Sequence, residues 1–148
     1  MKYSTKVSDA VHIMAFIVLN PAGSLTSSKI AESIKTNPAY VRQLMSSLRK
    51  SGLITSVKGH PRPALAKTPE DITLLDVYYA VEGQKPLLHL DTQTNPECGV
   101  GVNIQLALQD YFDQVQAQAE QKMKEITLKD ILKRYEERLA QSGQTFTR

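Results

Sequence analysis

The sequence predicts a mainly helical chain with one short β-hairpin. Three observations support this prediction. Apolar residues recur at helical spacing along most of the 148 residues. Residues 53–57 are apolar and β-branched and run into the turn residues 59–63, which is typical of a hairpin. The longest helical pattern, over 102–125, is roughly 35 Å long at 1.5 Å per residue, too long to be covered by so small a domain.

The first predicted helix covers residues 5–19. Its apolar residues at helical spacing are Val7, Val11, Met14 or Ala15, and Val18. Lys2 and Lys6 precede the apolar run as they would in a secretory signal, but Asp9 and His12 interrupt it and no small-residue cleavage site follows. We interpret the segment as a core helix that is too short to span a bilayer, and His12 as a packed or surface histidine.

Two further helices are predicted on either side of a tight turn at residues 35–37. The first covers about 27–34, with Thr26 or Ser27 as its N-cap. The second begins with Asn37 as N-cap and Pro38 at its first position, and Gly52 ends it. This spacing predicts a helix-turn-helix.

The second of these helices has two different faces. Val41, Leu44, Met45 and Leu48 form an apolar stripe. The opposite face carries Ala39, Gln43, Ser46 and Lys50, with Arg42 and Arg49 on its flank. No acidic residue occurs from Thr36 to Lys67. Such a face suits the major groove of DNA, where Gln and Arg read base edges while Lys and Ser hold phosphates. Taken alone, the helix fits an ordinary solvated face equally well.

The hairpin favours the DNA-binding interpretation. Residues 53–57 and 64–66 are its expected strands, and the basic residues Lys58, His60, Arg62 and Lys67 lie on or beside its loop. A basic hairpin directly after a helix that reads DNA is the layout of a winged helix-turn-helix.

At this point the sequence resembles the Rrf-two (Rrf2) family of bacterial transcription regulators. Four phrases carry the resemblance, in the expected order: residues 1–6, residues 40–45, residues 48–54, and residues 72–77 followed by 80–83. The chain departs from the family in its wing, which is shorter and contains Pro61 and Pro63. It also lacks the three cysteines with which some members bind an iron–sulfur cluster.

The resemblance and the acid-free face together imply a set of DNA contacts. That set is Lys2, Tyr3, Lys6, Ser27, Ser28, Pro38, Ala39, Tyr40, Arg42, Gln43, Ser46, Arg49, Lys50, Lys58, His60 and Arg62. We expect Gln43 and Arg42 near base edges, and Arg49, Lys50 and Arg62 nearer phosphate.

The second half of the chain is expected to form dimers. Thr73 and Asp76 resemble a capping box before a helix that Gly83 ends. In the long helix, apolar residues alternate in steps of three and four: Ile104, Leu108, Tyr111 or Phe112, Val115, Ala119 and Met123. The family pairs such a helix with its twin, and the alternative is packing against the chain's own helices. A last helix follows Thr127.

These elements predict one DNA-binding domain with a helical appendage. The expected divisions are a winged helix-turn-helix at 1–83, a connecting loop with Cys98 at 84–101, a dimerisation region at 102–141, and a tail at 142–148. Residues 1–67 carry ten basic against two acidic residues, a net charge of +8. Residues 68–148 carry eight against thirteen, a net charge of −5. Only the first half has the charge of a DNA-facing surface.

The cysteine count and the absence of known motifs argue against a metal or cofactor site and against an enzyme. One cysteine fits a reducing cytoplasm, and it gives a dimer two thiols where a cluster needs about four ligands, so we predict no metal and no cofactor. No phosphate-binding loop, metal spacing or nucleophile–base pair is found, so an enzyme is not expected. Cys98 is either a small structural residue or a thiol sensor, and the first reading is favoured.

We therefore expect a homodimeric DNA-binding regulator that acts as a repressor by binding an imperfect palindrome. We expect no membrane association. Two alternatives remain open. One is a winged-helix module that contacts protein or RNA. The other concerns only the switch: a small-molecule effector bound near the fourth helix and the Cys98 loop.

Overall fold

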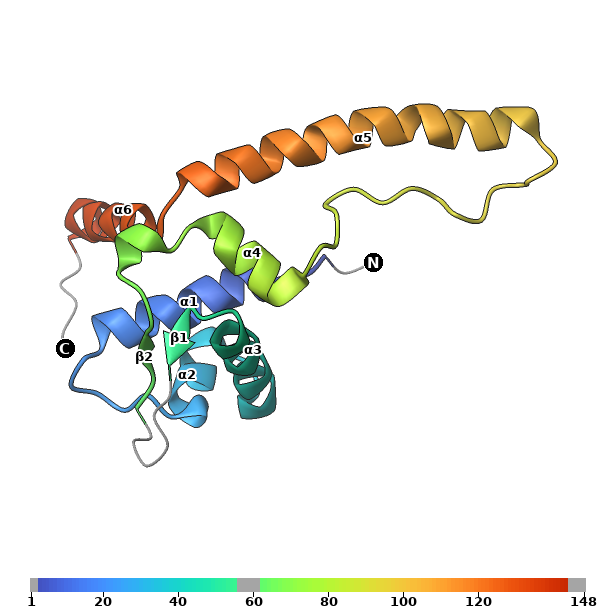
Figure 1. Cartoon of the computed structure of the whole chain (residues 1–148). Coiled ribbons are helices and arrows are strands. Elements are labelled where there is room, and N and C mark those ends of the chain that lie inside the picture. The colour runs from blue at the N-terminus through green and yellow to red at the C-terminus, as the bar shows by residue number, and fades with distance from the viewer. Residues whose placement is uncertain (1–2, 56–61, 144–148) are drawn as a thin grey trace.

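Helices dominate the chain, and the small hairpin sits among the first three of them. A computed structural model describes residues 3–55 and 62–143. Figure 1 shows the first helices, the hairpin and α4 gathered together, while α5 extends well beyond them. The elements are α1 Lys6–Leu19, α2 Ser27–Ile34, α3 Pro38–Lys50, β1 Ile54–Thr55, β2 Ala64–Leu65, the 3-10 helix η1 Pro69–Asp71, α4 Leu74–Glu82, α5 Gly99–Glu125 and α6 Leu128–Ser142.

α1 is a core helix, as predicted, but the apolar residues predicted at helical spacing match its buried face only in part. The buried residues are Ala10, Ile13, Met14 and Ile17, of which Met14 was among those predicted. Val7 and Val11 are only partly buried against this core. The cause is that α1 is apolar on nearly every side, so more than one stripe has helical spacing and the sequence does not select between them.

The helix-turn-helix forms as predicted. Thr26 caps α2, and the Asn37 side chain caps α3 by accepting a 2.8 Å hydrogen bond from the Tyr40 N–H. Between them Lys35 adopts a left-handed conformation (φ 68°), which is unfavourable for a residue with a Cβ. The predicted stripe of α3 is confirmed, because its four residues are all buried.

Gly52 ends α3 in a way that also positions the hairpin. Its φ is +74°, its N–H donates to the Arg49 carbonyl and the next N–H, of Leu53, donates to the Leu48 carbonyl, each at 3.0 Å. This is a Schellman motif with its usual apolar contact, since Leu48 and Leu53 both lie in the core. The chain therefore turns directly from α3 into β1.

Two paired strands of the predicted hairpin lie within the described residues. β1 and β2 pair antiparallel with Ile54 opposite Leu65 and Thr55 opposite Ala64. The loop at 56–61 lies outside the described residues, and with it Lys58 and His60. Lys2 and the tail at 144–148 also lie outside them.

The beginning of α6 is part of the same core as α1–α4. Leu74 N–H donates to the Ile126 carbonyl and Leu128 N–H to the Ile72 carbonyl, both at 2.8 Å. These bonds flank an isolated bridge between Thr73 and Thr127. Leu128 is 2% exposed and packs with Ile72. The predicted capping box of α4 is present, and Thr127 and Asp130 form a second one at α6. The long helix is thus fixed to the domain at its carboxyl end.

Among the described residues, no helix is both long enough and apolar enough to cross a membrane.

Candidate nucleic-acid interface

The outer face of α3 is exposed and free of acidic residues. The exposed side chains are Ala39, Arg42, Gln43, Arg49 and Lys50, and Ser46 is half-buried beside them. The two basic residues Arg49 and Lys50 lie in the last turn of the helix. One face therefore offers donors and acceptors for base edges together with cations for phosphate.

A hydrogen-bonded cluster holds the amino end of α3 against α1. The Tyr40 hydroxyl donates to Asp9 Oδ2 at 2.9 Å, and Thr5 Oγ1 donates to the same oxygen at 3.1 Å. Burial and the hydrogen bond to Asp9 both raise the pKa of Tyr40 above its usual value. Tyr40 was predicted as a DNA contact. In the structure its hydroxyl bonds to α1, and this contact helps to orient α3. No motif or spacing in the sequence indicates Asp9 as its partner.

A broad groove of about 760 Å³ runs between the amino end of α1 and the helix-turn-helix turn. Tyr3, Lys6, Lys35 and Asn37 line it, and Tyr3 is 89% exposed. Tyr40, in the first turn of α3, and Asp9 of α1 also line it. Two of the sites predicted near the phosphate backbone, Tyr3 and Lys6, are brought together here.

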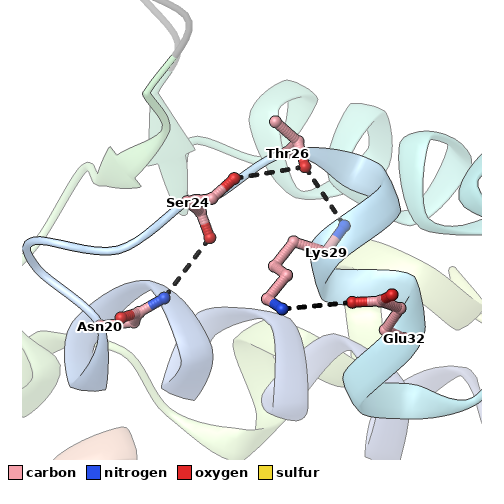
Figure 2. A network of polar contacts seen from close by, with 5 residues as sticks. All are labelled: Asn20, Ser24, Thr26, Lys29 and Glu32. Carbon is pink, nitrogen blue, oxygen red and sulfur yellow. Dashed lines mark hydrogen bonds and ion pairs between the residues drawn. The ribbon is translucent and has the colours of Figure 1, made fainter.

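Polar contacts order the chain that enters α2 (Figure 2). Thr26 Oγ1 accepts from the Lys29 N–H at 3.2 Å, and Lys29 Nζ lies 3.3 Å from Glu32 Oε2. Ser27 is half-buried and Ser28 exposed in the first turn. A hollow of about 220 Å³ separates Ser27 from Arg42 and Arg49 of α3. Ser27 and the two arginines therefore border one small space.

Arg62 has a role that the sequence did not indicate. Its Nη1 donates to the Gly23 carbonyl at 2.7 Å, and its Nη2 donates to the carbonyls of Asn20, at 2.8 Å, and Pro21. A planar guanidinium presents its N–H donors in a fixed fork that suits several acceptors at once, whereas a lysine ammonium carries three donors on a flexible stem. Arg62 thus ties the base of the wing to the turn between α1 and α2, and motif reading offers no signal for this contact.

The predicted apolar seam of α5 divides between two faces. Leu108, Phe112, Ala119 and Met123 are half-buried, on the side where Gln116 donates to Tyr78 Oη at 3.3 Å and Glu120 accepts from Tyr79 Oη. Ile104, Tyr111 and Val115 are 53%, 67% and 48% exposed. With Val100, 76% exposed, they follow one another in steps of four, seven and four and so share a second face. We call these four residues the outer stripe of α5.

Cys98 is exposed and occupies the N-cap position of α5 without making a side-chain capping bond. The favoured expectation of a small buried structural residue is therefore wrong as to burial within one chain.

The described residues do not fit a metal centre. They contain no group of three or more His, Cys, Asp or Glu side chains placed to hold a metal ion. Because the whole sequence has one cysteine, the donor set does not suit an iron–sulfur cluster either.

Comparison with known proteins finds similarity to one family of transcription regulators over most of the chain. The model of the Rrf2 family, described as an iron-dependent transcriptional regulator, matches residues 3–134. YwnA of Bacillus subtilis, whose name proposes an HTH-type transcriptional regulator, is 39% identical over 129 residues, covering 87% of this chain and 96% of YwnA.

Two solved structures are similar over most of their length. A crystal structure described as that of a proposed DNA-binding protein is 38% identical with a TM-score of 0.69, covering 86% of this chain and 98% of that one. IscR of T. potens is 28% identical with a TM-score of 0.66, covering 93% of this chain and 90% of its own.

Proposed function

The chain belongs to the Rrf2 family of transcription regulators, and from that premise we propose that it represses transcription by binding an imperfectly palindromic operator as a homodimer. The family membership makes it a DNA-binding transcription regulator and not an enzyme. Dimerisation, the palindrome and repression are the proposed refinements. The family description names iron, but the donor set described above does not fit it, so we assign no step to a metal.

The observation that carries the proposal is the exposed, acid-free face of α3. A helix enters the major groove only if one side is free of its own domain and carries no repelling charge. Here the opposite stripe is buried, the amino end is held by Tyr40 and Asp9, and the carboxyl end is fixed by the Schellman turn at Gly52. In this proposal Gln43 and Arg42 face base edges, and Arg49 and Lys50 face phosphate.

The outer stripe of α5 supports the homodimer. Half-exposed apolar side chains along one face of a long helix lose unfavourable contact with water when they are covered. A second copy offers the same stripe, so a twofold axis would cover both at once. Two recognition helices about 34–36 Å apart would then match half-sites one DNA turn apart. Occupying a promoter in this way blocks polymerase sterically.

Salt dependence tests the proposal against a winged-helix module that contacts protein or RNA. A bound duplex should first be selected from random double-stranded DNA, and its affinity then measured by fluorescence anisotropy between 50 and 200 mM salt. Six or more phosphate contacts would lower the affinity about 10³-fold or more over that range. The matched variant Gln43→Ala should lose preference for the selected duplex but keep the salt slope. Weak, salt-insensitive binding by the parent would instead favour the alternative.

A further inference from the structure

A second hollow lies on the side of α1 that faces away from the core. It has a volume of about 490 Å³, within the range of small-molecule pockets. α1, α6 and the end of α2 form its walls. Its lining residues are His12, Ala15, Phe16, Leu19, Asn20, Ser33, Ile131, Leu132 and Tyr135. Nothing in the DNA-binding proposal uses this space.

The lining limits the chemistry of an occupant. Most of it is aliphatic or aromatic, and within the described part of the chain no Lys, Arg, Asp or Glu lines it. A charged molecule would lose its hydration there without gaining an ionic partner, which is costly. An uncharged, largely apolar molecule would lose only unfavourable contact with water.

One polar contact gives the pocket a link to the helix-turn-helix. His12 Nε2 and Ser33 Oγ are 2.8 Å apart and join α1 to α2 at the pocket wall. A ligand hydroxyl or carbonyl that engages the His12 ring nitrogen competes with Ser33 for it. Since α2 is the first helix of the helix-turn-helix, breaking this bond loosens the element on which α3 packs.

α1 provides a second path in the same direction. Its opposite face carries Ile13, Met14 and Ile17, which are buried in the core beside the stripe of α3. Leu132 of α6 packs against that core from the other side of the pocket. An occupant that separates α1 from α6 therefore changes the support of the recognition helix.

We propose that this pocket, between α1 and α6, binds an uncharged, mainly apolar organic molecule with one hydrogen-bonding group, and that its occupation weakens operator binding. The regulatory half of this inference rests on the proposed function. The binding half does not, so the two are measured separately.

N-phenyl-1-naphthylamine is a suitable probe, because it is uncharged, carries one N–H and fluoresces in apolar surroundings. Titrated into the full chain, it should bind with one site per chain and raise the melting temperature. Ala15→Phe fills the pocket from α1 and should lower probe affinity at least tenfold. Ala140→Phe, the same change at an exposed position of α6, should leave it within twofold. If Ala15→Phe fails to fold, Ile131→Trp fills the pocket from the opposite wall.

The second measurement is operator affinity with and without the probe. We expect the probe to weaken binding at least fivefold for the parent and for Ala140→Phe, and to leave Ala15→Phe unaffected. Equal probe binding by the parent and Ala15→Phe would overturn the proposal, as would absence of binding because a second copy covers the pocket. Probe binding that leaves operator affinity unchanged overturns the regulatory role. A parent that binds the probe but no duplex contradicts the proposed function and not the pocket.

Discussion

Replacing Ile104 by Glu should dissociate the proposed homodimer. Ile104 is 53% exposed within one chain, so its burial in an interface gains about 1 kcal/mol, and about 2 kcal/mol for the two copies of a symmetric dimer. The variant loses that gain and must also remove two carboxylates from water, which adds at least about 1 kcal/mol. A total near 3 kcal/mol raises the dimer dissociation constant more than about 100-fold. Analytical ultracentrifugation across a micromolar concentration series measures the change.

Leu106 supplies the matched control. It is 61% exposed and lies only two residues from Ile104, but roughly 200° around the helix axis, away from the outer stripe. Leu106→Glu makes the same chemical change on the same helix and should leave the dimer intact. If Leu106→Glu dissociates the protein as strongly as Ile104→Glu does, the outer stripe is not the interface. A parent that is monomeric at micromolar concentration while binding a palindrome tightly would refute the dimer itself.

Further substitutions test DNA binding and the stability of the fold. In electrophoretic competition assays, Gln43→Ala should lose about 1–3 kcal/mol of discrimination against mismatched operators, whereas Lys50→Ala should weaken binding to every duplex alike and flatten the salt slope. Arg62→Lys keeps the charge but not the three-carbonyl clamp, so it should lower the melting temperature nearly as much as Arg62→Ala; a Lys variant as stable as the parent would show that the clamp is unimportant. Lys35→Gly removes the cost of the left-handed conformation and should stabilise the fold by about 0.5–1 kcal/mol in urea unfolding. The hydrogen bonds from Thr127 lower the pKa of Asp130, so its charged form stabilises the fold above the unfolded pKa and this contribution is lost as pH falls through the folded one. Asp130→Ala should accordingly lower the melting temperature at pH 7, and this difference should shrink as the pH is lowered below the usual aspartate pKa of 3.8.

Local chemistry explains which features could be predicted from the sequence. The caps at Asn37 and Thr73 and the glycine that ends α3 depend on residues within a few positions of one another, and the structure has all three. The buried stripe of α3 was also recoverable, because its outer face is strongly polar and leaves a single apolar side. On α1 the same reasoning was less successful. Apolar residues lie on nearly all of its sides, so no strongly polar face shows which side is buried.

Long-range contacts explain most of what was missed. The partner of Arg62 lies some 40 positions earlier in the chain and consists of backbone carbonyls, which every residue possesses. Asp9 and Tyr40 are 31 positions apart. In a basic half of the chain, the sequence alone does not indicate that Asp9 accepts a hydrogen bond from the Tyr40 hydroxyl. Neither pairing has a spacing or a composition that a single sequence can display.

The seam of α5 shows a different limit, because one periodic pattern can serve two partners. Apolar residues at steps of three and four predict that a helix is covered, but they do not say by what. Phe112 and Met123 face the side on which Gln116 and Glu120 meet α4, whereas Ile104 and Val115 face outward, and the two sets interleave in the sequence. Leu108 belongs to the first set, so Leu108→Glu would disturb the chain's own packing as well as any dimer. The structure therefore makes Ile104 the more informative position, since more than half of it is exposed and a charge there disturbs the chain's own packing less.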